Sequence, residues 1–190
     1  MNYRESSARL ADYRRQIADL RDKMREARAA AEPEEVPDYT FTTLAGSVRL
    51  SELFGDKPGV IVIHNMGSSC PSCTLWADGF NGIYDHLASR AAFVVSSPDA
   101  PAAQKSFAAG RGWRFPMVSH SGTTFAADMG YRSAEGGWLP GVSVFQREGN
   151  RILRVADSGF APGDDFCSLW HIYDLLPGGA GDWQPRYRYG

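Results

Sequence analysis

The sequence lacks several features that would assign it to common classes of protein. Its 190 residues include 20 lysines and arginines against 22 aspartates and glutamates, so the formal net charge is only −2. No dense basic patch interleaved with aromatic residues occurs, which argues against a nucleic-acid partner. No apolar run approaches the length that crosses a membrane. We therefore expect neither a nucleic-acid partner nor a membrane-embedded segment.

Cysteine is also scarce, with three in the chain. The first residues, 1–6, are polar and charged and contain no apolar stretch that would direct export, so the cytoplasm is the expected location. A reducing compartment disfavours a structural disulfide. Cys70 and Cys73 form a natural pair, and Cys167 is expected to be a small buried hydrophobic residue.

What the sequence does contain is a pair of cysteines at a strand-to-helix junction. Cys70-Pro71-Ser72-Cys73 follows the apolar, β-branched segment 59–64 and precedes apolar residues at helical spacing. The N-terminus of a helix presents free N–H groups and partial positive charge, which favour a thiolate over a thiol. A CxxC pair in this context is typical of a redox-active dithiol, and the alternative is a pair of unreactive core cysteines.

Residues 3 to about 31 predict one long helix with a narrow apolar seam. The seam residues recur at alternating steps of three and four: Leu10, Tyr13, Ile17, Leu20, Met24, Ala27 and Ala31. Such a helix is marginal alone in water, so its seam must pack on something. The sequence leaves two partners open, the protein's own globular domain and the same helix in a homodimer. Proline and glutamate in residues 32–37 predict a linker, which completes an N-terminal segment 1–37.

Residues 38–177 predict one α/β domain, and residues 178–190 form a glycine-rich, then aromatic and basic tail. Alternation of strands and helices in the first part requires parallel pairing with a right-handed crossover. The expected elements, in order, are strands 39–41 and 48–50, a helical turn at 51–56, strand 59–64, helix 71–89, strand 92–96, helix 101–110, an extended segment 115–119, helix 124–129, strands 141–146 and 151–155, and helix 164–176.

This order of elements is similar to the thioredoxin-like fold in its redoxin form. A finer resemblance is to the bacterial family of thioredoxin-like proteins known as domain of unknown function 899. Four stretches carry it: Cys70–Cys73 with Trp76–Phe80, Gly112–Pro116, Pro140–Phe145 and Trp170–Pro177. The resemblance covers nearly the whole chain. It implies a three-layer α/β/α sandwich with a mixed central sheet, an N-terminal β-hairpin and an added long N-terminal helix, and it implies dithiol–disulfide oxidoreductase activity.

Two positions depart from other members of that fold. Thioredoxins place a tryptophan just before the first cysteine, where this chain has Ser68-Ser69, and Trp76 follows the pair. Peroxiredoxins carry threonine or serine three residues before the peroxidatic cysteine, where this chain has Gly67. The second departure disfavours peroxidase chemistry of that type.

The catalytic roles follow from position. Cys70, at the helix start, is expected to be the attacking thiolate, and Cys73, one turn inside, the resolving thiol of a mixed-disulfide mechanism. His64 lies at the spacing where thioredoxins carry a buried carboxylate and is expected to move a proton for Cys73; the alternative is a satisfied histidine at a strand end. Pro140 is expected to be the cis-proline that faces the dithiol, and the alternative is a trans proline that starts a strand.

The substrate expected for this site is a protein or small-molecule disulfide or thiol. Trp76, Trp113 and Gly141 are the expected substrate-binding residues, with Asp78, Phe80 and Trp138 as further candidates for the same groove. Most of the tryptophans are expected to belong to the core. No phosphate-binding loop occurs, and no cofactor is implied.

Two rival functions stay open. Cys70, Cys73, His64 and His120 could form a Cys₂His₂ metal site, although no second pair at zinc-finger spacing occurs and the proline beside the dithiol would obstruct a closed site. We therefore assign no metal ligands. The other rival is a non-catalytic interaction module in which the long helix is the functional element.

Overall fold

The computed structural model describes residues 2–189, and the chain divides after residue 34 into two compact units. The first unit is helix α1, Tyr3–Ala30, which confirms the predicted helix. A capping box starts it: the Asn2 side chain accepts from the Glu5 N–H, and the Glu5 carboxylate accepts from the Asn2 N–H. No residue of α1 is buried, and its seam residues from Leu10 to Met24 are 43–58% exposed.

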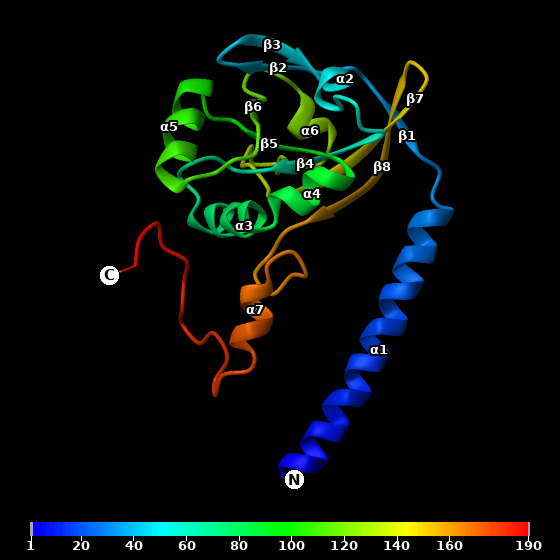
Figure 1. Ribbon diagram of the computed structural model, residues 1–190, viewed down its shortest axis with the longest axis vertical. Coiled ribbons are helices and arrows are strands. Elements are labelled where there is room, and N and C mark those ends of the chain that lie inside the picture. Colours follow the sequence, from blue (N-terminus) through cyan, green and yellow to red (C-terminus); the bar gives the residue numbers. More distant parts are fainter. Residues whose placement is uncertain (1, 190) are drawn as a thin grey trace. The chain divides into compact units, whose positions relative to one another are not determined.

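An eight-stranded mixed sheet organises the rest of the described chain (Figure 1). Its order is β1-β8-β7-β4-β5-β6-β2-β3. The strands are β1 Glu34–Val36, β2 Thr40–Thr43, β3 Gly46–Arg49, β4 Gly59–His64, β5 Ala92–Ser97, β6 Met117–Ser119, β7 Gly141–Glu148 and β8 Arg151–Gly159. Strands β4, β5 and β6 are parallel, whereas β7 pairs antiparallel with β4 and β8, and β2 pairs antiparallel with β6 and β3.

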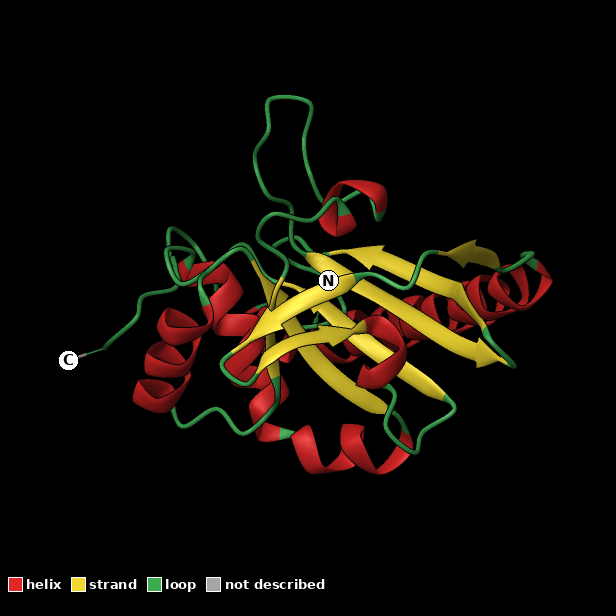
Figure 2. Cartoon of the chain, turned by 90° about the horizontal axis from the view of Figure 1, so that it is seen from above, coloured by secondary structure: helices red, strands yellow, loops and turns green. Residues whose placement is uncertain are grey.

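Helices cover both faces of this sheet (Figure 2). They are α2 Leu50–Leu53, α3 Pro71–Gly82, α4 Tyr84–Arg90, α5 Pro101–Arg111, α6 Phe125–Asp128 and α7 Ser168–Tyr173. Because side chains alternate along a strand, Val62 of β4 joins one core with Phe125 of α6, and Ile63 joins the other with Trp76 of α3. The predicted three-layer sandwich with a mixed sheet and an N-terminal hairpin is confirmed.

Several element ends shift, most of all that of β8, which extends to Gly159 instead of residue 155, and three further elements differ from those the sequence predicts. Part of the expected linker is strand β1, in which Val36 is buried and Glu35 pairs with Arg151 of β8. The helix expected at 71–89 is two helices, because the backbone leaves helical geometry at Ile83 (φ −115°, ψ 13°), just after Gly82.

The third difference is the last helix, which spans only Ser168–Tyr173 rather than 164–176. The Asp164 carboxylate accepts from the N–H groups of Ala161 and Phe166, which holds this segment in a turn instead of a helix. Phe166 and Leu176 lie outside this shorter helix, and both are exposed, as is Ile172 within it. The expectation for Cys167 is confirmed, since only 7% of this residue is exposed.

Candidate active site

Cys70 is the N-cap residue of α3, at the point where the chain leaves the sheet. Its backbone is extended (φ −103°, ψ 105°), and Pro71 occupies the first turn. The Cys70 carbonyl accepts from the Thr74 N–H at 3.1 Å, which is the first hydrogen bond of the helix. The Cys70 Sγ accepts from the Cys73 N–H at 3.1 Å, so the sulfur takes the place that a serine or aspartate oxygen fills at other helix starts.

These contacts stabilise the thiolate form of Cys70. A hydrogen bond from the Cys73 side chain is the largest cause, and backbone N–H groups of Cys73 and Ser72 add to it, so that the pKa of Cys70 falls from 9 to about 6 despite opposition from burial. The sulfur is half-buried and carries no disulfide. Cys70 is therefore mainly a thiolate at neutral pH, which is the nucleophilic form.

Cys73 has the opposite electrostatics. Its side chain donates to Cys70 and is only 2% exposed, and both the hydrogen bond and the burial raise its pKa far above the usual range. It therefore holds its proton as long as Cys70 is ionised. The two cysteines thus form an asymmetric pair of an accessible thiolate and a buried thiol.

The loop between β4 and α3 is fixed by two side chains. Asn65 Oδ1 accepts from the Gly67 N–H at 2.8 Å, and Asp99 Oδ2 accepts from the Ser68 N–H at 2.7 Å. Gly67 has φ +103°, and a Cβ placed on it would lie 2.9 Å from Asp99 Oδ1. The position three residues before Cys70 therefore requires glycine, both for its backbone conformation and for space.

His64 ends β4, but its side chain points to the sheet face opposite α3. Its Nε2 lies 2.9 Å from Ser143 Oγ, and its ring stacks on Tyr131 with centroids 3.8 Å apart. Burial, with smaller contributions from His120 and Arg154, holds the pKa of His64 well below its usual range. Within residues 2–189 no hydrogen bond joins this imidazole to Cys73. The structure does not bring together the two groups that the proton-transfer hypothesis requires.

The expectation of a cis-proline is wrong. Every peptide bond within the described residues is trans, including the one before Pro140. The Pro140 carbonyl accepts from the Phe160 N–H at 2.9 Å. Pro140 therefore extends the pairing of β7 with β8 by one hydrogen bond before β7 begins. Its neighbour Gly141 is buried against the Tyr131 ring.

The two tryptophans expected to bind substrate differ in burial. Trp76 is 3% exposed, packs against Phe160 and donates through Nε1 to Asp164 at 3.3 Å, so it belongs to the core. Trp113 is half-buried and donates through Nε1 to Asp78 at 2.8 Å. Of the further candidates, Phe80 is buried, whereas Trp138 is half-buried and packs edge-on against the His120 ring.

Cys70, Cys73, His64 and His120, the candidate ligands of the rival metal site, do not form a metal-binding cluster. No group of three or more histidine, cysteine, aspartate or glutamate residues in the described chain is arranged to hold a metal ion. His120 hydrogen-bonds through Nδ1 to Ser96 at 2.8 Å, and burial lowers its pKa to about 4.

In the part of the chain that is described, no helix is long and apolar enough to cross a membrane.

The C-terminal tail lies next to the site, a position that sequence reasoning missed. Arg111 of α5 binds the Asp78 carboxylate of α3 through two nitrogens and donates through Nη1 to the Tyr187 carbonyl at 2.8 Å. Pro185 of the same tail is buried. The tail is therefore fastened to α5 beside the dithiol, a placement that its glycine-rich and aromatic composition does not encode.

Several solved structures with a similar fold are peroxiredoxins. Reduced Prx3 from Vibrio vulnificus is 16% identical with a TM-score of 0.56 over 70% of this chain and 89% of that one. Peroxiredoxin Q from Xanthomonas campestris is 18% identical with a TM-score of 0.55, and peroxidoxin BcpB from Mycobacterium tuberculosis is 28% identical with a TM-score of 0.52; each match covers 64% of this chain and 80% of its own. The fold and the dithiol define a thioredoxin-like oxidoreductase with thiol-based redox chemistry.

The sequence also matches a family profile over residues 1–189. The chain belongs to this family, which is described as bacterial protein of unknown function DUF899. The resemblance predicted from the motifs is thereby confirmed. No curated protein matches the sequence.

Proposed function

We propose that the protein is a thiol–disulfide oxidoreductase in which Cys70 attacks a substrate disulfide and Cys73 resolves the product. The observation that carries the proposal is the asymmetry of the pair: Cys70 is accessible and ionised, and Cys73 is buried and protonated. Two chemically equivalent core cysteines would show neither the shared hydrogen bond nor opposite shifts of pKa.

The first step consumes the charge on Cys70. The thiolate attacks one sulfur of the substrate disulfide, a new bond forms to Cys70 Sγ, and the other substrate sulfur leaves as a thiolate that takes up a proton. The negative charge on Cys70, which raises the pKa of Cys73, is then lost. Cys73 can now give up its proton and attack Cys70 Sγ, so the second substrate thiol leaves and a Cys70–Cys73 disulfide remains. Two electrons have passed to the substrate, and an external thiol must restore the dithiol.

Peroxide reduction is the nearest alternative, because the similar solved structures are peroxiredoxins. The geometry of the loop favours disulfide exchange. Position 67 holds glycine at a positive φ beside the Asp99 carboxylate, so the hydroxyl residue that peroxiredoxins place there is missing and would be strained in this backbone conformation. We propose the cytoplasm as the compartment, because external thiols that can restore the dithiol are available there.

The proton-transfer role of His64 and the substrate-binding roles of Trp76, Trp113 and Gly141 stay predictions. A proton-transfer role for His64 would have to act through groups other than a direct contact, since its partners are Ser143 and Tyr131. Trp113 remains a candidate for substrate binding because it is half-buried and bonded to Asp78.

Dimerisation through α1 also stays a prediction. Basic residues flank the apolar seam at the positions that face a partner helix: Arg14, Arg21 and Arg28 on one side, Arg9 and Lys23 on the other. Pairing of two copies would bring these like charges together. We therefore expect any association through α1 to strengthen as salt screens the repulsion.

A redox titration with reduced and oxidised glutathione tests the proposed function. We expect a loss of two hydrogens that is fully reversible and maps to Cys70 and Cys73. Cys167, which is buried and has a pKa raised by burial, should stay a thiol throughout. The matched control is Cys167→Ser, which should titrate like the natural chain. A chain that forms no Cys70–Cys73 disulfide at any glutathione ratio would refute the proposal.

A further inference from the structure

A cavity of about 430 Å³ lies next to the loop that leads to the dithiol and belongs to no role assigned so far. It begins at Ser68, two residues before Cys70, and extends along α5. Its lining includes Ser68, Ser106, Phe107, Arg111, Tyr187 and Arg188. Its volume is in the range that takes a small molecule rather than a protein surface.

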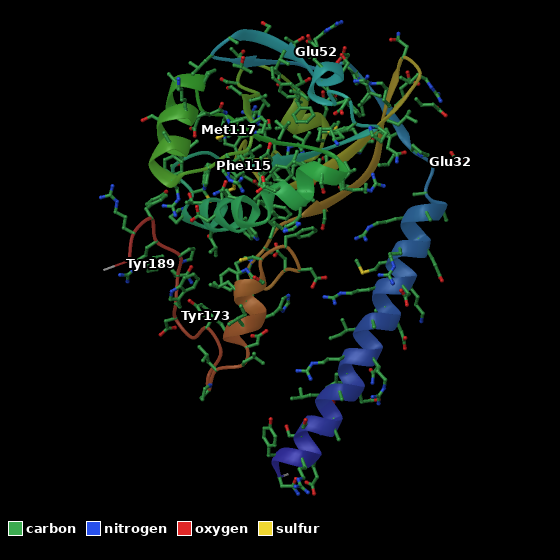
Figure 3. The ribbon with its side chains drawn as sticks, in the orientation of Figure 1. Glu32, Glu52, Phe115, Met117, Tyr173 and Tyr189 are labelled. Carbon is green, nitrogen blue, oxygen red and sulfur yellow. The ribbon has the colours of Figure 1, made fainter. Side chains whose placement is uncertain are left out.

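The C-terminal tail forms one wall of this cavity. Arg111 holds the Tyr187 carbonyl, and the Tyr187 ring packs edge-on against Phe107 of α5 with centroids 6.2 Å apart. Farther back, the Trp183 ring packs against Trp170 and Tyr173 of α7. Figure 3 shows this tail, with Tyr173 labelled on α7, which precedes it, and Tyr189 labelled near its end. Contacts with α5 and α7 therefore hold the tail in place.

The Tyr187 side chain is close enough to the dithiol to be affected by its charge. Burial raises the pKa of the Tyr187 phenol, and the negative charge of the dithiol adds to that shift. Ser68, two residues before Cys70 on the loop that leads into α3, lines the same cavity as Tyr187, so an occupant lies next to the segment that carries the dithiol.

The charges of the lining point to the chemistry of the occupant. Two arginines line the cavity, and no acidic side chain is among the lining residues. The Arg111 guanidinium is bound to the Asp78 carboxylate, which leaves Arg188 as the main source of positive charge. A substrate that carries carboxylates would be repelled by the Cys70 thiolate, and a guanidinium in the cavity offsets that repulsion by attracting the carboxylates.

We propose that this cavity binds the non-reacting end of a small disulfide substrate that carries carboxylate groups, with Arg188 as the residue that selects for them. The inference rests on the proposed function, because it names the substrate class of the same dithiol. It assigns to the tail a role in specificity that the CxxC motif alone does not supply.

The experiment compares three small disulfides that differ in charge: oxidised glutathione, which is anionic, hydroxyethyl disulfide, which is neutral, and cystamine, which is cationic. Each is reacted with the reduced natural chain, with Arg188→Glu and with Arg186→Glu. The second variant is the matched control, because it makes the same change of charge in the same exposed tail but outside the cavity lining. The ratio of rate constants for glutathione and hydroxyethyl disulfide cancels any general change in thiol reactivity.

We expect Arg188→Glu to lower this ratio roughly tenfold and to raise the rate with cystamine, as reversal of a charge within several ångströms should do. Arg186→Glu should change the ratio less than about twofold. Equal effects of the two variants, or no effect of either, would overturn the inference and leave the proposed function standing. If the natural chain reduces none of the three disulfides, the proposed function fails and the inference fails with it.

Discussion

Replacement of Cys73 by serine is expected to turn the protein into a covalent trap for its substrates. Cys70 keeps a hydroxyl donor at position 73 and so still attacks, but no second thiol can resolve the mixed disulfide. Replacement of Cys70 by serine removes the nucleophile, and disulfide exchange should fall by at least about a thousandfold. Non-reducing electrophoresis and mass spectrometry of protein incubated with oxidised glutathione or a disulfide-bonded protein measure both effects.

The trap also assigns the two roles. Only the Cys73→Ser chain should accumulate adducts, each attached to Cys70 and each released by a strong reductant. Cys167→Ser is the control and should show neither trapping nor loss of rate, since this residue is buried in the core. Equal trapping by the two single variants of the pair would show that the assignment of nucleophile and resolving thiol is wrong.

Replacement of Gly141 by alanine is expected to lower the free energy of unfolding by about 3 kcal/mol, because it overpacks a site that cannot expand. A Cβ at this position would lie 2.1 Å from Tyr131 Cε1 and 2.6 Å from the Ser158 carbonyl oxygen. The Tyr131 hydroxyl is itself held by the Val142 carbonyl at 2.7 Å, so the ring cannot move aside without loss of that bond. Urea unfolding followed by circular dichroism measures the change.

Gly159 supplies a matched control, because it is the cross-strand partner of Gly141. A Cβ at Gly159 would meet nothing within 4 Å, so Gly159→Ala should change the free energy of unfolding by less than about 0.5 kcal/mol. A similar cost for the two alanines would mean that loss of glycine from a strand, not the contact with Tyr131, determines stability here.

The elements that a local pattern determines were predictable from the sequence. Strand β4 has the predicted bounds, 59–64, because an apolar β-branched run bounded by a proline and a polar loop leaves few alternatives. The position of Cys70 at the start of α3 follows from Pro71, which suits the first turn of a helix. These two local features were enough to place the dithiol.

The features that depend on tertiary contacts were not predictable. The sequence spacing of His64 and Cys70 gives no information on which sheet face α3 covers, and the imidazole lies on the other face with Tyr131. Likewise, no local signal fixes the isomer of the peptide bond before Pro140, which was predicted to be cis and is trans. The anchoring of Tyr187 by Arg111 joins residues 76 positions apart and leaves no local signal.

The most direct test of the central claim is the rate of alkylation of Cys70 as a function of pH. Because the pKa of Cys70 is lowered from 9 to about 6, Cys70 is mainly a thiolate at neutral pH and loses that form as the pH falls through 6. The rate with iodoacetamide, read for Cys70 alone by peptide mapping, should therefore be half-maximal near pH 6 and constant above pH 8. A rate that is still rising at pH 8, with a midpoint near 9, would contradict the account.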